Sequence, residues 1–398
     1  MFPKTDPADL ALFGGQPLFD TIRSISNLVQ PDVERFLAYS KIAHDAGQFT
    51  DHGAVEREFE RRVAQFHQVE HAVSFAGGFW GIVFAIKCLA LPGRTEVVMP
   101  SLTYRRLADI VAWAGLTPHY CEVDPATLSI TAATAAPHIN ENTALILGVH
   151  PIVNCCDVDG LERLSSETGI PLLFDAVESV YETYRGRKIG SCGRAECFSM
   201  QSSKLFNAFE GGYVTTNDGE LAARLREARA QGLRDDGTLG ELGFDTRQNE
   251  IHAAMALAAL DDVDAQVERN RERYYAYKRL VPTVPDMRLL TFDESERCGF
   301  KNIVVELRDG WPVKREHVLA ILHAEHMLSR PYYFPALHQK RTEYATVHGD
   351  LSATERLAER FLMLPCGHFV SVADIESIVA LLRFVHAHAD AINERLAK

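Results

Sequence analysis

The sequence predicts an α/β fold built on a mostly parallel sheet that helices cover on both faces. Two observations support this prediction. Between about residues 70 and 217, short β-rich runs alternate with helical patterns, and that alternation is typical of parallel strands joined by crossover helices. One apolar run, at 171–174, ends in Asp175. Because ligands in such sheets bind beyond the carboxyl ends of the strands, functional residues are expected at that edge.

The expected elements follow from hydrophobic periodicity. Two helices come first, at 31–46 and at 55–67, the second with charged residues on an amphipathic pattern. Helices at 79–91 and 159–168 lie between strands. A long helix is expected from 249 through 278, apolar in its first half and charged in its second. The expected strands of the sheet are 96–99, 119–123, 144–149, 172–174, 196–199 and 212–216.

The length of 398 residues exceeds one ordinary core, so two domains are expected. We place a large domain at 1–265, with an N-terminal helical segment, and a smaller α+β domain at 266–398. The smaller domain would contain a strand at 302–307, a helix at 314–326 and a terminal helix from 372 to about 396.

Composition restricts the class of partner. The formal net charge of −13 argues against binding to nucleic acid or to anionic membranes, although a small phosphorylated ligand needs only local donors. No apolar run is long enough to span a bilayer, and the first residues lack the pattern of a signal peptide, so we expect a cytoplasmic protein. The eight cysteines are scattered, which favours reduced, mostly buried thiols.

The pair Asp175 and Lys204 has a chemical interpretation. An Asp at the tip of a buried strand can hold a pyridine nitrogen protonated, and a lysine in a hydroxyl-rich loop can form a Schiff base with an aldehyde. Ser199, Ser202 and Ser203 precede this lysine, and Gly211-Gly212 follow it. The alternatives are that Asp175 caps the next helix and that Lys204 is a solvated surface residue.

Two further segments fit an anionic, planar ligand. Gly77-Gly78 precede the helix at 79–91, where free N–H groups and the helix dipole make an anion site, although a tight turn explains them equally well. Tyr104 follows a strand and could stack on a planar ring, or it could belong to the core or an interface. His317, His323 and His326 share helical spacing, which we interpret as a partly exposed helix face, and we predict no metal site.

Taken in order, these segments resemble the DegT/DnrJ/EryC1/StrS family of sugar aminotransferases, which depend on pyridoxal phosphate and have the aspartate aminotransferase fold type I. The segments that carry the resemblance are 13–19, 50–53, 100–104, 156–159, 174–176, 198–212, 250–255 and 330–338. The resemblance implies a large domain with a mostly parallel seven-stranded sheet between helices, a smaller C-terminal α+β domain, and a homodimer with its active site at the interface.

The resemblance also implies roles for single residues. Lys204 looks like the Schiff-base lysine and proton shuttle, and Asp175 like the partner of the pyridine nitrogen. Glu178 falls beside the ring and the sugar. The remaining candidates would contact the cofactor: Ser199 its phosphate, Tyr104 its ring face, Gly78 and Phe79 the phosphate cup, and Asp245 the phosphate across the dimer interface.

Three segments depart from the family pattern. The cup, Gly77 to Trp80, lacks the usual threonine and carries two bulky rings. Asp245 replaces an expected Asn, and a carboxylate facing a phosphate is repulsive. After His150 the chain reads Pro151 to Asn154 instead of an aromatic-Gly-x-Pro segment.

The resemblance predicts an aminotransferase that moves an amino group from an amino acid, expected to be L-glutamate, to a keto-sugar. The expected acceptor is a nucleotide-linked 4-keto-6-deoxy sugar, in amino-sugar biosynthesis. The alternatives are action on a ketone without a nucleotide, a sugar dehydratase or lyase of the same fold, and a catalytically impaired regulatory homologue.

Overall fold

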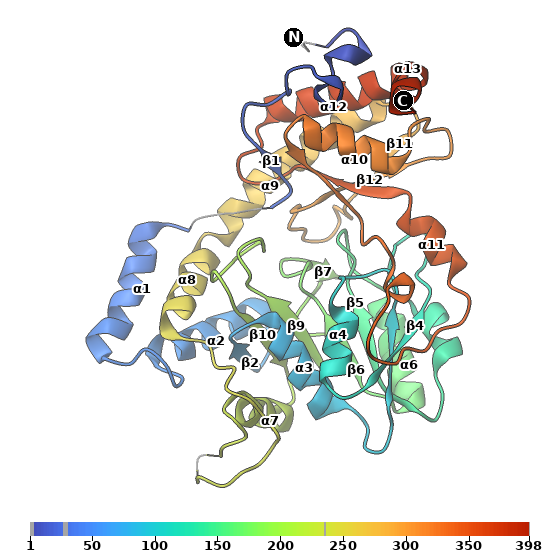
Figure 1. Cartoon of the computed structure of the whole chain (residues 1–398). Helices are drawn as coiled ribbons and strands as arrows, with labels where there is room; N and C mark the ends of the chain where they lie inside the picture. Colours follow the sequence, from blue (N-terminus) through green and yellow to red (C-terminus); the bar gives the residue numbers. More distant parts are fainter. Residues whose placement is uncertain (1–3, 27–30, 235, 398) are drawn as a thin grey trace.

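The computed structural model describes residues 4–26, 31–234 and 236–397. Two sheets of different size define two units, which the long helices α8 (Glu250–Asp261) and α9 (Val263–Leu280) connect (Figure 1). The larger unit holds a seven-stranded sheet and the smaller one a four-stranded sheet. Residues 1–3, on which the signal-peptide expectation partly rests, lie outside the described ranges.

The large sheet confirms the predicted fold class. In the order β2-β10-β9-β6-β5-β3-β4, every pairing is parallel except the two made by β10. All six predicted strands are present. The strands are β2 (His71–Phe75), β3 (Glu96–Pro100), β4 (Thr117–Cys121), β5 (Thr143–Val149), β6 (Leu172–Asp175), β9 (Ala195–Ser199) and β10 (Gly212–Thr216).

Both faces of this sheet are buried. Neighbouring residues of one strand, such as Val97 and Val98 or Leu173 and Phe174, belong to two separate apolar clusters. That division follows from the alternation of side chains along a strand. The helices of this unit are α1 (Val33–Ala46), α2 (Ala54–His67), α3 (Gly78–Leu89), α4 (Leu107–Trp113), α5 (Ala132–Ala135), α6 (Val158–Thr168) and α7 (Gly219–Arg229).

The smaller unit contains an antiparallel sheet in the order β11-β12-β15-β14. The N-terminal segment packs against this smaller unit. Its strand β1 (Arg23–Ser24) pairs with β13 (Met327–Leu328), and Lys4 forms an ion pair with buried Glu325 at 3.0 Å. The elements are β11 (Met287–Leu289), β12 (Ile303–Leu307), β14 (Arg330–Pro331), β15 (Phe361–Leu364), α10 (Arg315–Ala324), α11 (Ser352–Ala358), α12 (Val372–Ala387) and α13 (Ala389–Leu396). The division at 265/266 remains a prediction.

The expected long helix at 249–278 is interrupted at Asp262, which has φ −100° and ψ 1°. Its carboxylate accepts a hydrogen bond from the N–H of Asp32 at 3.1 Å and pairs with Arg35 at 2.6 Å. The break therefore turns a polar side chain toward the start of α1. The expected terminal helix is interrupted in the same way at His388.

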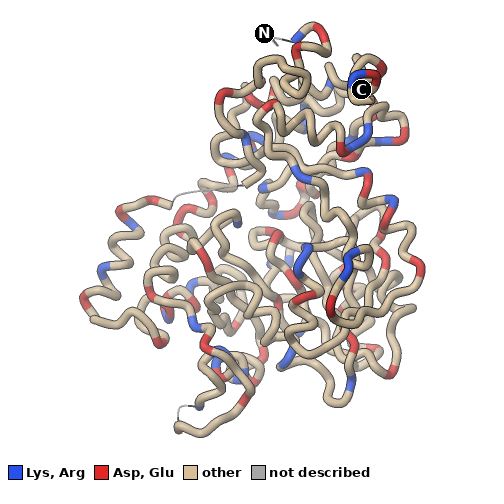
Figure 2. The backbone as a smooth tube through the Cα atoms, viewed as in Figure 1, with Lys and Arg blue, Asp and Glu red and all other residues tan. Residues whose placement is uncertain are grey.

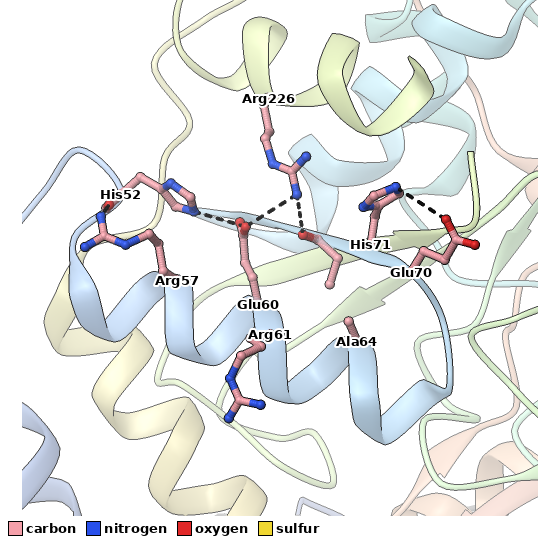
Figure 3. A pocket seen from close by; sticks show the side chains of 9 residues that line it. His52, Arg57, Glu60, Arg61, Ala64, Glu70, His71 and Arg226 are labelled. Atoms are coloured by element: carbon pink, nitrogen blue, oxygen red, sulfur yellow. Dashed lines mark hydrogen bonds and ion pairs between the residues drawn. The ribbon is translucent and has the colours of Figure 1, made fainter. Parts of the chain in front are cut away.

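A buried ionic network joins α2, β2 and α7. The Arg229 guanidinium lies 2.6 Å from Glu60 and 3.2 Å from Glu56, and it donates to the Oγ of Ser74 at 2.8 Å. All four side chains are almost inaccessible. On the outer side of the network, His52 and Arg226 approach Glu60 (Figure 3).

Acidic and basic residues are interspersed over both units (Figure 2). Among the described residues, no helix combines the length and the apolarity needed to cross a membrane. Seven of the eight cysteines are buried and all eight are free, which confirms the prediction of mostly buried thiols.

Candidate active site

Asp175 occupies the predicted place. It is the last residue of β6 and is 5% exposed. Its Oδ1 accepts a hydrogen bond from the N–H of Val177 at 3.1 Å. Burial raises the pKa of Asp175 to about 6, although that hydrogen bond and the charge of Lys204 act in the opposite direction. A cation placed against this carboxylate would therefore be bound strongly.

Lys204 lies in the loop between β9 and β10, and its ammonium reaches across to Glu178. The Nζ atom donates to Glu178 Oε1 at 2.6 Å. The other oxygen of Glu178 accepts hydrogen bonds from Lys301 Nζ at 2.8 Å and from Asn302 Nδ2 at 3.0 Å. The structure thus brings Asp175, Glu178 and Lys204 together at the carboxyl edge of the sheet.

Three backbone segments meet close to Ser199. A Cβ on Gly78 would lie 2.9 Å from the Cβ of Ser199, and a Cβ on Gly212 would lie 2.4 Å from the Cα of Gly78. Gly211 has φ +141°, a conformation that favours glycine. This close approach places the N-terminus of α3 next to Ser199, and helix N-termini bind anions. The N–H of Gly78 itself donates to the carbonyl of Gly211 at 3.2 Å.

The bulky rings of Phe79 and Trp80, which follow Gly78, pack against aromatic residues away from Ser199 and Gly212. Phe79 contacts Trp80 at a centroid distance of 5.3 Å, and Trp80 contacts Trp113 at 6.1 Å and Phe244 at 6.0 Å. Both rings are half-buried against the apolar cluster that includes β2 and α4. These contacts explain why large residues are tolerated directly after Gly78.

Tyr104 is 46% exposed, beyond the end of β3. Its neighbour in space is Tyr333, from the smaller unit, which has φ +45°. Burial raises the pKa of Tyr333 well above its ordinary value, and the nearby charges of Glu178 and Asp175 act in the same direction. Tyr104 and Tyr333 thus stand on the side of the site that faces the smaller unit.

Among the described residues, no hydrogen bond or ion pair links Asp245 to the other candidate site residues. It pairs with Arg247 at 2.8 Å and accepts a hydrogen bond from Gln231 at 3.4 Å. Arg247 also pairs with Asp51. The hydrogen bond from Arg247 lowers the pKa of Asp245, so its charge is balanced within the chain. A role across a subunit interface remains a prediction.

The segment after β5, which departs from the family pattern, connects the two units. Asn154 Oδ1 accepts from the N–H of Asp293 at 2.7 Å, and its Nδ2 donates to the carbonyl of Thr291 at 3.1 Å. Asn154 has φ +68°, which an Asn tolerates better than most residues. This departure therefore has a structural explanation.

Sequence reasoning missed Lys301, Asn302 and Tyr333 as site residues. All three belong to the smaller unit and meet the sheet edge only in the folded chain. Lys301-Asn302 directly precede the apolar run of β12. The polar pair before a buried strand is a local signal for Lys301 and Asn302, and Tyr333 lies within the 330–338 segment that carries the family resemblance.

A surface hollow of about 180 Å³ lies elsewhere, between α2, β2 and α7 (Figure 3). Its lining includes His52, Arg57, Glu60 and Arg226. These side chains already bond one another or the backbone. The hollow is therefore part of the ionic network and not of the lysine site.

The chain matches the model of the DegT/DnrJ/EryC1/StrS aminotransferase family over residues 31–383. It belongs to that family. The match confirms the predicted resemblance, and with it an aminotransferase with pyridoxal phosphate as its cofactor.

Individual relatives cover most of the chain. GDP-perosamine synthase of Caulobacter vibrioides is 31% identical over 82% of this chain and 88% of its own length. A solved structure of DesI in the presence of its TDP-sugar product superposes with a TM-score of 0.93 at 32% identity, covering 99% of this chain and 100% of that one. A glutamine:2-deoxy-scyllo-inosose aminotransferase of Streptomyces fradiae is 34% identical, and the match spans 57% of this chain and 56% of that protein.

The residues of this site fit pyridoxal phosphate. Gly78 and Gly212 let three segments approach so closely that an added Cβ would clash with a neighbouring segment, and the N-terminus of α3 together with Ser199 would hold the phosphate. Asp175 would hold the pyridine nitrogen, and Lys204 the aldehyde carbon. When bound, the cofactor supplies an electron sink for proton removal from the amino-group carbon. Lys204, beside Glu178, would carry that proton.

The raised pKa of Asp175 leads to a stability prediction. The ordinary pKa is 3.8 and the folded value about 6, so the folded state disfavours the carboxylate. This cost is fully present above pH 6 and disappears as the pH falls toward 3.8. We expect Asp175→Asn to stabilise the cofactor-free protein by about 2 kcal/mol at pH 8, with little gain at pH 4.

Urea unfolding at the two pH values measures this difference. The same variant should bind the cofactor more weakly, because the partner of the pyridine nitrogen loses its charge. A stability gain that is equal at both pH values would show that the carboxylate is not the cause.

Proposed function

We propose that this enzyme transfers an amino group to the keto group of a nucleotide-linked sugar, with a 4-keto-6-deoxy sugar as the acceptor. The main support for this proposal is the structural match to DesI, which was solved in the presence of its TDP-sugar product. The match extends over essentially the whole length of both chains. The match to GDP-perosamine synthase supports the same substrate class. Retention of Lys204, with Asp175 and Glu178 beside it, argues against an impaired homologue.

A second acceptor class has its own support. The Streptomyces fradiae relative is named for an acceptor without a nucleotide, 2-deoxy-scyllo-inosose, and for glutamine as the donor. That match spans little more than half of either chain. We therefore propose a nucleotide-linked sugar as the first-ranked acceptor and the cyclitol as the second. We propose L-glutamate as the donor, with glutamine as the alternative.

The test compares acceptors on the aminated form of the enzyme. The protein is first treated with L-glutamate and freed of the keto acid, and it is then offered dTDP-4-keto-6-deoxyglucose, GDP-4-keto-6-deoxymannose or 2-deoxy-scyllo-inosose. We expect mass spectrometry to show an amino sugar from a nucleotide-linked ketone. Amination of the cyclitol alone would contradict the proposed substrate.

The proposed active form is a homodimer in the cytoplasm. Apolar side chains are exposed on α1, which lies beside α8, and on the loop after α7, at 231–234 and 236–244, which projects below the large unit (Figure 1). Exposed apolar patches of this kind are typical of interfaces. The residues are Val33, Leu37, Ile42, Leu233, Leu239, Leu242 and Phe244. Sedimentation equilibrium should give twice the chain mass, and a monomer at micromolar concentration would contradict the dimer.

A further inference from the structure

Glu178 lies between two lysines that come from different units. Lys204 follows β9 of the large sheet, and Lys301 directly precedes β12 of the small one. The two ammonium groups bond different oxygens of Glu178, at 2.6 and 2.8 Å. The side chains of Lys204, Glu178 and Lys301 are 19%, 15% and 10% exposed. Solvent therefore screens these charges weakly.

The two lysines decide the charge of Glu178. Burial by itself raises the pKa of Glu178, but the charges of Lys204 and Lys301 outweigh it and hold that pKa well below its ordinary value. Once the Lys204 nitrogen is bonded to the aldehyde carbon of the cofactor, with loss of water, its charge depends on pH. Lys301 and the amide of Asn302 then remain as permanent partners of the carboxylate.

Lys301 is fixed in place by its surroundings. The residue is 9% exposed, and its carbonyl accepts a hydrogen bond from the Sγ of Cys366 at 3.0 Å. Other groups also face this cluster from the elements packed against it. The charges of Glu178 and Lys204 act on Asp175, and the charge of Glu178 acts on Tyr332, Tyr333 and Cys366.

Lys301 belongs to the smaller unit and bonds Glu178 directly, whereas Asp175 and Lys204 belong to the larger unit. The charge of Lys301 opposes a second positive charge on the Lys204 nitrogen, whereas the charge of Glu178 favours one. Both ammonium groups bond the carboxylate of Glu178, and a like charge so placed disfavours protonation of its neighbour in a buried site. The balance between Lys301 and Glu178 therefore sets the pH at which that nitrogen gains its proton.

We infer that Lys301 is a positioning residue of the reaction: it keeps Glu178 ionised and lowers the proton affinity of the Lys204 nitrogen in the cofactor-loaded enzyme. The inference rests on the proposed role of Lys204. It also gives the smaller unit a direct part in the acid–base chemistry of the large one.

The test is a pH titration of the visible absorption of the loaded enzyme, which reports the protonation of the nitrogen bonded to the cofactor. Lys301→Met should raise the midpoint by about one pH unit, because a neighbouring positive charge is removed. Glu178→Gln should lower it, because the opposing negative charge is removed. Lys301→Arg, which keeps the charge, and Lys314→Met, at an exposed position of the same unit, should leave the midpoint at the wild-type value.

An unchanged or lowered midpoint in Lys301→Met would overturn the inference. If this variant does not fold or load, Lys301→Gln replaces it, since an amide can still bond Glu178 without charge. A wild-type midpoint in Lys301→Gln overturns the inference equally.

Borohydride reduction followed by peptide mapping separates this outcome from failure of the proposed site. Cofactor found on Lys204 with an unmoved midpoint in the Lys301 variants rejects the role of Lys301 alone. Cofactor found on another lysine rejects both.

Discussion

Replacing Lys204 with alanine is expected to abolish amino transfer while leaving the fold intact. Lys204 Nζ is the amine that lies at the carboxyl edge of the sheet, bonded to Glu178 and close enough for its charge to act on Asp175. Loss of proton transfer alone costs about 10²–10⁴ in rate, and the variant also loses the covalent bond to the cofactor. Product formation under single-turnover conditions measures the first effect, and cofactor retained after dialysis measures the second.

The matched control is Lys314→Ala, an exposed lysine of the smaller unit that lies outside the proposed interface. It should keep the wild-type rate and the wild-type cofactor content. Circular dichroism should show the same helix content in both variants. Full turnover by Lys204→Ala would place the chemistry on another residue and reject the site.

The second large effect concerns stability. Arg229→Met is expected to lower the free energy of unfolding by about 3–5 kcal/mol, because it leaves Glu56 and Glu60 buried without their cation. The control is Arg226→Met. Arg226 lies 3.8 Å from Glu60 and its side chain is 39% exposed, so its loss should cost less than about 1 kcal/mol. Urea unfolding of both variants at neutral pH makes the comparison.

The pH dependence gives the Arg229 prediction a second readout. Burial by itself raises the pKa of Glu60, but the charge of Arg229, together with the bond and charge of His52 and the N–H of Ser74, outweighs burial and lowers that pKa to about 2, below the ordinary 4.5. A lowered carboxyl pKa contributes stability that is present above pH 4.5 and is lost as the pH falls toward 2. This part of the acid sensitivity should be smaller in Arg229→Met. Equal losses of stability in the Arg229 and Arg226 variants would contradict the network.

Much of the large unit could be predicted from sequence because its strands are short, apolar and separated by periodic helices. β2 escaped prediction because its run, His71 to Phe75, contains Ser74 at a buried position. That hydroxyl is accommodated by Glu56, Glu60 and Arg229. Partners so distant in the chain cannot be inferred from the local pattern.

The candidate site shows the same limit. Asp175, Ser199 and Lys204 are linked to strand ends of one sheet, so local sequence places them near one edge. Lys301 and Tyr333 reach that edge only through the packing of the smaller unit, which local sequence does not encode. The assignment of Asp245 depends on a second subunit, and within one chain its charge is balanced by Arg247.

The visible spectrum of the purified protein tests the central claim, that Lys204 holds pyridoxal phosphate for amino transfer. We predict a yellow protein whose absorption is lost on addition of L-glutamate and returns on addition of a nucleotide-linked 4-keto-6-deoxy sugar. Lys204→Ala should show neither change. A wild-type protein that stays colourless with added pyridoxal phosphate, or whose absorption glutamate and glutamine both leave unchanged, would contradict the account.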